Sequence, residues 1–305
     1  MAFDFSEYLD QYRHSGYGND SDETSADSSP LLKLTSDCMY YNIDDLSRFV
    51  KQNENYDYTL FHLNIRSIPA KYDELKTMVS ELDNLGLNID FIMICETFLN
   101  DTNMNMYHIP GYQFVCNNRV IGKGGGVALY IRDKFHITQR PDLTLNYGTE
   151  FESIFVEVSC DDKTLMVGEI YRIPGSNDQV SVERFDSLLH SLTNFKGHII
   201  IGTDQNFNFL NVQHHNKTLE LLNVFIASGF FPTITIPTRI THDTSSLIDN
   251  IYVKLSDKHE VSSGVVTTDI SDHLPIFNFI GRQPENKFVK YRKLDDNAIQ
   301  RIMSF

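Results

Sequence analysis

From residue 58 onward, short apolar runs alternate with amphipathic segments, and several of these runs end in a polar residue. The run YTLFHLN ends in Asn64, IDFIMICE ends in Glu96, and HIIIGTD ends in Asp204. Apolar runs of about four to eight residues are typical of buried strands, because helices need longer patterns. The alternation therefore predicts an α+β protein in which sheets form the core and helices lie outside.

Three segments have the apolar spacing of amphipathic helices, namely residues 70–86, 181–195 and 218–230. The first and the third reach a glycine at or near their ends, Gly86 and Gly229, which is a common signal for the end of a helix. These segments predict the helices that cover the sheets.

Three apolar runs follow one another closely, at residues 124–131, 153–159 and 164–171. Strands so close in sequence indicate antiparallel hairpins. We therefore expect mixed sheets, in a two-sheet core flanked by helices, which suits a single domain of about 225 residues.

The two ends of the chain differ in composition from this central part. Residues 15–30 are rich in Ser, Asp and Gly and lack periodicity, which is typical of disorder. A short helix is expected over Ile43–Val50. We expect an acidic, largely disordered leader at 1–57, a domain at 58–281 and a charged tail at 282–305.

Composition limits the cellular setting and the kind of partner. No apolar run approaches the ~18 residues of a membrane span, the acidic N-terminus does not look like an export signal, and the four cysteines form no CxxC pair. We expect a nuclear or cytoplasmic protein that is not secreted and has no disulfide framework. The net charge is -15 and is spread over leader and body, so bulk charge does not favour nonspecific DNA binding.

The polar residues at the strand ends include Asn64, Glu96, Tyr171, Asp204 and the pair Asp272-His273. Each alone is more often structural or solvated than functional. Together they predict a site, because strand ends at one edge of packed sheets provide a rigid frame for catalytic groups.

Eight motifs occur in a family-specific order along residues 58–280. They are HLNIRS (62–67), ICET (94–97), GGGVALYI (124–131), EIYRIPG (169–175), GTDQNFN (202–208), PTRIT (237–241), SLIDNI (246–251) and SDHLPI (271–276). On these motifs the chain resembles the endonuclease/exonuclease/phosphatase family, and within it the apurinic-type endonuclease of LINE-type non-LTR retrotransposons.

The resemblance implies a DNase I-like fold, which is a four-layer α/β/β/α sandwich of two mixed sheets. It also implies a Mg²⁺-dependent endonuclease, with Mn²⁺ as an alternative ion, that nicks one strand of DNA. The nick would leave a 3′-hydroxyl for target-primed reverse transcription. The tail resembles the link to a reverse transcriptase, so a longer parent protein is expected, and the chain itself is expected to be a monomer.

The resemblance also implies roles for the strand-end residues. Glu96 would be the metal ligand, with Asn64 beside it as a second ligand or as an orienting group, since Mg²⁺ takes only one or two protein carboxylates. Asp204 would accept a proton from the attacking water. Asn206 would donate to the phosphate or hold Asp204, and Tyr171 would offer its phenol to a phosphate oxygen.

His273 would contact the scissile phosphate as a proton donor or cation. A histidine does this well when a carboxylate holds its other nitrogen, and Asp249 is the expected holder. Asp272 would be a further acid near the metal or the water. Four arginines are candidate contacts to nucleic-acid phosphates: Arg66, Arg119, Arg172 and Arg239.

The chain departs from the family pattern at two places. The usual Gly-Asp-x-Asn reads Gly202-Thr203-Asp204-Gln205-Asn206, with one residue inserted after the glycine, which puts the turn geometry in doubt. Arg66 stands where some members have an acid, which weakens the case for a further metal ligand. Two alternatives stay open: a same-fold phosphatase or RNA nuclease, and a catalytically silent, domesticated binding protein.

Overall fold

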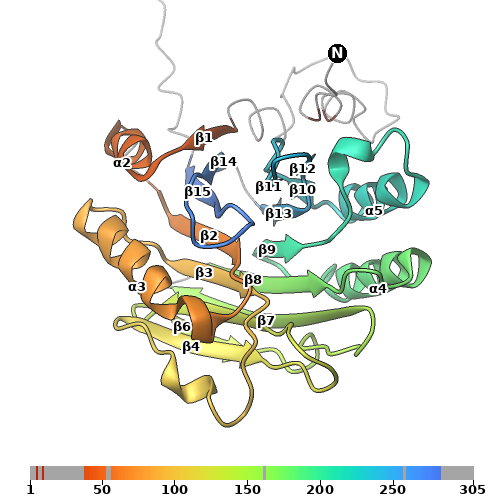
Figure 1. Ribbon diagram of the computed structural model, residues 1–305, viewed down its shortest axis with the longest axis horizontal. Helices are drawn as coiled ribbons and strands as arrows, with labels where there is room; N and C mark the ends of the chain where they lie inside the picture. Colours follow the sequence, from red (N-terminus) through yellow and green to blue (C-terminus); the bar gives the residue numbers. More distant parts are fainter. Residues whose placement is uncertain are drawn as a thin grey trace, which may run out of the picture.

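Two mixed β-sheets pack face to face, and helices cover the outer face of each (Figure 1). The computed structural model describes residues 5, 9, 38–52, 56–160, 163–256 and 259–282. The expected four-layer α/β/β/α sandwich is confirmed.

The first sheet has seven strands in the order β1-β14-β15-β2-β3-β5-β4. These are β1 (Met39–Tyr41), β2 (Tyr58–Asn64), β3 (Phe91–Cys95), β4 (Tyr112–Asn117), β5 (Val127–Arg132), β14 (His259–Val266) and β15 (Ile276–Arg282). The second sheet has six strands in the order β10-β13-β9-β8-β7-β6. These are β6 (His136–Gln139), β7 (Phe151–Cys160), β8 (Lys163–Arg172), β9 (His198–Asp204), β10 (Phe231–Pro232) and β13 (Asp249–Lys254). A small hairpin joins β11 (Arg239–Ile240) to β12 (Ser245–Ser246).

The helices lie where their apolar faces meet a sheet. On the first sheet lie α2 (Ile43–Gln52) and α3 (Ile68–Asn84), and on the second lie α4 (Asp178–Ser191) and α5 (Asn216–Ala227). Short 3₁₀ turns occur at η2 (Met104–Met106) and η3 (Phe209–Asn211). At the start of α3 the Ser67 hydroxyl caps the helix by accepting from Ala70 N, and Gly86 follows the helix at a φ of 87°.

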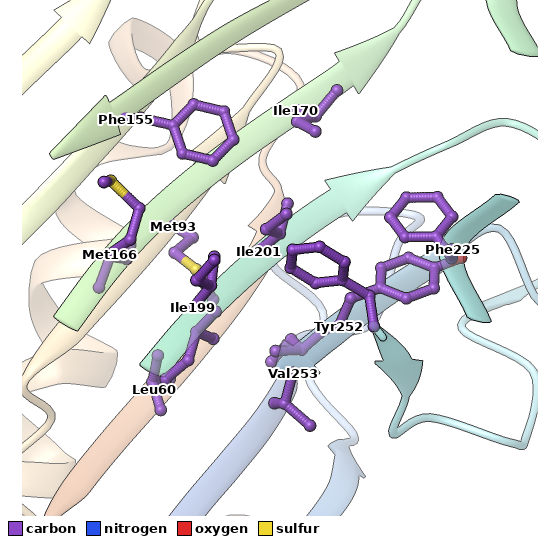
Figure 2. Packing of buried hydrophobic residues seen from close by; sticks show 14 of the residues in the cluster. Leu60, Met93, Phe155, Met166, Ile170, Ile199, Ile201, Phe225, Tyr252 and Val253 are labelled. Carbon is purple, nitrogen blue, oxygen red and sulfur yellow. The ribbon is translucent and has the colours of Figure 1, made fainter. Parts of the chain in front are cut away.

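Apolar side chains fill the space between the sheets. Figure 2 shows Leu60 and Met93 of the first sheet packed near Met166 and Ile199 of the second. Successive residues of a strand point to opposite faces, so β2 turns Leu60 inward and Phe61 outward toward α3. The same alternation turns His62 and Asn64 of β2 into the gap between the sheets, where they meet Glu169 and Asp204 of the second sheet.

Elements that precede residue 58 also pack against the first sheet. Strand β1 pairs in parallel with β14, and the ring of Phe49 in α2 stacks on Phe279. Phe5 is also buried, with its ring centroid 5.2 Å from that of Phe209. The rest of the expected leader, including 15–30, and the tail from 283 lie outside the described residues.

Within the described ranges, no helix has the length and apolar character needed to cross a membrane.

Candidate active site

Strand pairing brings the predicted site residues to one edge of the two sheets. In the first sheet β2 and β3 run parallel, with Asn64 opposite Cys95, so Glu96 follows at the same end. In the second sheet β8 and β9 run parallel, with Tyr171 opposite Asp204. Parallel strands end at the same edge, which is why residues far apart in sequence meet here.

Asn64 joins the two sheets through its side-chain amide. Its Nδ2 donates to Glu96 Oε1 and to Asp204 Oδ2, each at 2.8 Å, while its Oδ1 accepts from Arg66 N at 3.2 Å. The nitrogen must face the two carboxylates, since an oxygen there would repel them. This placement suits the orienting role of the two that were expected for Asn64.

Glu96 has the geometry of a hard-cation ligand. Its Oε1 accepts from Asn64 and from the Tyr171 hydroxyl, the latter at 3.0 Å. Its Oε2 accepts no hydrogen bond from the described residues, and the side chain is half-buried rather than sealed. A single held carboxylate that leaves room for water fits Mg²⁺, which keeps several waters and uses few protein ligands.

His273, in the loop before β15, and Asp249, at the start of β13, form a buried dyad. His273 Nδ1 lies 3.0 Å from both carboxylate oxygens of Asp249, and the Thr238 hydroxyl donates to Asp249 Oδ2 at 2.6 Å. Burial by itself would lower the pKa of His273, but the charge and hydrogen bond of Asp249 outweigh it and raise that pKa to about 9. The imidazole is therefore a cation at neutral pH, and Nε2 is left for a substrate.

Asp204 lies beside the dyad, opposite Asp249 in the antiparallel pairing of β9 and β13. Burial, followed by the charge of Asp249, raises the pKa of Asp204 to about 7. A carboxyl group with this pKa suits a base that accepts a proton near neutral pH. Ligand atoms of Asp204, Asp249 and His273 all lie within 4.8 Å of one another, which is also close enough to hold a metal ion.

Asn206 stabilises the turn that follows Asp204. Its backbone N–H donates to Asp204 Oδ1 at 3.1 Å, and its side-chain Nδ2 donates to the carbonyl of Arg172 at 2.8 Å. Of the two expected roles, the contacts therefore fit holding Asp204. The inserted Thr203 is an ordinary strand residue, since it pairs with Ile170 and Asn250 without a break in register.

Asp272 lies between two of the predicted arginines. Its Oδ2 accepts from Arg66 Nη1 at 2.9 Å and from Arg239 Nε and Nη2 at 3.0 and 2.7 Å. Burial opposes the shift, but these hydrogen bonds lower the pKa of Asp272. The carboxylate fixes two partly exposed guanidinium groups at the rim of the site.

The other two arginines are turned into the protein. Arg172 is buried and donates to Ser181 Oγ, to the carbonyls of Asn206 and Ser176, and to Asp178. Its donors hold the turn at Asn206, and its contact with nucleic acid stays a prediction. Arg119 pairs with the buried Glu152 at 2.5 Å, and its guanidinium lies 5.6 Å from the Tyr171 ring, so it supports that tyrosine.

Two buried residues next to the site were not predicted. His62 Nδ1 lies 3.0 Å from Glu169 Oε2, and His62 Nε2 lies 3.6 Å from Asp249 Oδ1. Burial would lower the pKa of His62, but the charges of Glu169 and Asp249 raise it to about 10. The sequence held a signal for both, since each stands two positions before a predicted site residue, Asn64 or Tyr171, and so shares its face of the strand.

The backbone is strained around the same edge. Five non-glycine residues have positive φ in the described part of the chain, and all five lie in the turns that follow β2, β3 and β9: Arg66, Ser67, Glu96, Phe98 and Asn206. Such conformations cost about 1–3 kcal/mol each and tend to cluster at functional sites. Their concentration here marks this edge as the site.

Comparisons with solved structures agree with this fold. The endonuclease domain of TRAS1, a telomere-specific non-LTR retrotransposon, matches with a TM-score of 0.58 and 15% identity, over 74% of this chain and 98% of that one. An AP endonuclease from Archaeoglobus fulgidus matches with a TM-score of 0.55 and 14% identity, over 72% and 98%. A mannosyl-6-phosphatase from Bacteroides thetaiotaomicron matches with a TM-score of 0.54 and 17% identity, over 73% and 99%.

No curated protein matches the chain. The model of the endonuclease/exonuclease/phosphatase family matches residues 61–273, a span that holds every predicted catalytic residue. The chain therefore belongs to the endonuclease/exonuclease/phosphatase family.

Proposed function

We propose that this chain is a Mg²⁺-dependent endonuclease that nicks one strand of DNA and leaves a 3′-hydroxyl. The proposal rests on the meeting of three groups at one edge of the sheets. They are the cationic imidazole of His273, the carboxylate base of Asp204, and Glu96 with one oxygen that accepts no hydrogen bond. Phosphodiester hydrolysis needs these parts: charge stabilisation at the phosphate, an activated water and a ligand for a metal.

Each group has a role set by its contacts. Asp204 removes a proton from the water that attacks phosphorus. Asn64 donates hydrogen bonds to both Asp204 and Glu96 and so fixes the Asp204 carboxylate next to Glu96. His273, held by Asp249, presents Nε2 to a nonbridging oxygen as charge develops there. The phosphorus–O3′ bond breaks, and the Tyr171 hydroxyl stabilises the departing oxygen, which takes a proton from solvent water and becomes the 3′-hydroxyl.

Mg²⁺ bound through Glu96, or Mn²⁺ in its place, would neutralise charge on the phosphate. The residues fit such an ion, because Glu96 offers a free oxygen while Asn64 and Tyr171 hold the other oxygen of the same carboxylate.

Two features favour DNA over a small phosphate ester. Arg66 and Arg239 are fixed at the rim with partly exposed guanidinium groups, where they can contact phosphates that flank the scissile one. Two proteins that share this fold, the TRAS1 domain and the archaeal AP endonuclease, are nucleases. A role within a retrotransposon, followed by a reverse transcriptase, belongs to the same proposal.

The test is nicking of supercoiled plasmid with Mg²⁺, comparing wild type with His273→Ala. His190→Ala is a matched control, since it removes an exposed histidine of α4. We expect nicks that a DNA polymerase can extend, lost in EDTA and in His273→Ala but retained in the control. Nicking that persists in either condition would refute the proposal, and so would preferential hydrolysis of RNA or of a sugar phosphate in a substrate panel. A chain that cuts nothing would instead favour the silent binding protein.

A further inference from the structure

Behind the site, a histidine and a glutamate meet across the gap between the sheets. His62 belongs to β2 of the first sheet and Glu169 to β8 of the second, and both side chains are 0% exposed. Their 3.0 Å contact is surrounded by the apolar core. Burying two ionisable groups costs several kcal/mol per charge, and apolar residues of similar volume are often as stable or more so. A contribution to stability alone therefore does not explain why the protein has this pair at this position.

The pair is continuous with the catalytic dyad. The second ring nitrogen of His62 lies 3.6 Å from Asp249 Oδ1, and Asp249 in turn holds His273. The groups alternate as acid, imidazole, acid and imidazole, from Glu169 in the core to His273 at the substrate face. Asp249 thus has an imidazole on each side, with His62 in an ion-pair contact and His273 within hydrogen-bond distance.

A glycine makes room for this arrangement. A Cβ at Gly202 would lie 2.4 Å from Glu169 Oε2 and 3.0 Å from His62 Nδ1. Gly202 stands within β9 and is not among the glycines with positive φ, so its backbone does not require glycine. Glycine inside a strand often marks close approach of other groups, and here those groups are the His62–Glu169 pair.

Cys95 is the remaining polar neighbour, and its thiol lies near enough that His62, Cys95 and Glu169 could form a metal cluster. Burial raises the pKa of the Cys95 thiol well above its usual range. The direct contact occupies His62 Nδ1 and Glu169 Oε2, and His62 Nε2 faces Asp249. The cluster is therefore better explained by hydrogen bonding than by metal binding.

We propose that His62 and Glu169 are positioning residues that hold Asp249, and through it His273, in the orientation needed for catalysis. This role rests on the proposed nuclease activity. Neither residue touches the substrate. Their loss lets Asp249 rotate, so that His273 is no longer aimed at the phosphate.

The test removes the pair without leaving a lone buried charge. The double variant His62→Leu/Glu169→Leu replaces both groups with apolar ones. Thr233→Val is the matched control, since it removes another buried hydrogen bond between the sheets, from Thr233 Oγ1 to Asn278 Oδ1 at 2.9 Å. Each protein is measured by thermal unfolding, by kcat and KM for plasmid nicking, and by the low-field NMR resonance of the proton between His273 Nδ1 and Asp249.

We expect the double variant to fold as stably as the control, with kcat about 10- to 100-fold lower, KM unchanged and the His273 resonance shifted or broadened. The control keeps wild-type values for kcat and for the resonance. A double variant with wild-type kcat and an unchanged resonance would overturn the role. If that variant does not fold, His62→Gln decides by the same criteria, because it keeps a donor for Glu169 but loses the ring nitrogen that faces Asp249. The NMR result stands even if wild type cuts nothing, so failure of the nuclease proposal can be distinguished from failure of this one.

Discussion

His273 Nδ1 lies 3.0 Å from both carboxylate oxygens of Asp249, although the two residues are 24 positions apart in the chain. Asp249 begins β13 of the second sheet, and His273 lies in the loop before β15 of the first. The dyad therefore exists only when the sheets are packed. Packing of the sandwich brings the two halves of the dyad together.

Asp249→Asn should abolish most activity while leaving the fold intact. The amide keeps the shape of the side chain but removes the charge that holds the imidazole in its tautomer and stabilises its cation. We expect kcat to fall on the order of 10²- to 10⁴-fold. Asp243→Asn is a matched control, since Asp243 pairs with His242 on the exposed surface. Equal activity of the two variants in the plasmid assay would contradict the dyad.

Asn64→Asp should damage both activity and stability, because it places a third carboxylate between Glu96 and Asp204. Two hydrogen bonds of 2.8 Å would be replaced by contacts between acceptors. We expect the free energy of unfolding to drop by about 1–3 kcal/mol. Chemical denaturation measures this change, and Asn208→Asp, in the nearby turn, serves for comparison. An unchanged unfolding midpoint at neutral pH would show that the Asn64 nitrogen does not face the two acids.

The pH profile of kcat/KM should have two limbs. Asp204 must be deprotonated to act as base, so activity rises as pH increases through its pKa of about 7. His273 must be protonated, so activity falls as pH rises through about 9. Because the Asp249 charge is what raises the pKa of His273, the residual activity of Asp249→Asn should lose its alkaline limb near 9 and fall off closer to the ordinary histidine value of 6.5. An alkaline limb that stays near 9 in this variant would assign it to another group.

The strand ends could be read from the sequence because each depends on a local pattern. An apolar run that stops at Asn64 or Asp204 predicts both the strand and the edge at which its last side chain lies. Arg172 could not be placed in this way, since a long side chain can turn outward to solvent or inward to Ser181 and Asp178, and only tertiary packing decides. The His62–Glu169 contact could not be predicted either. It joins two sheets, and no local sequence pattern determines which residues of one sheet face which residues of the other.

Arg66 and Arg239 should act on substrate binding rather than on the chemical step. Both donate to Asp272 at the rim, with side chains 54% and 39% exposed, so both can release counterions when DNA binds. Alanine at either position should raise KM more than it lowers kcat, and should reduce the slope of log affinity against log salt by about 1. Lys196→Ala is the control, since this exposed lysine precedes β9 at the edge opposite the site. DNA affinity measured over a series of salt concentrations tests this prediction. If the slope of log affinity against log salt falls as much for Lys196→Ala as for the arginine variants, the two arginines make no specific phosphate contact.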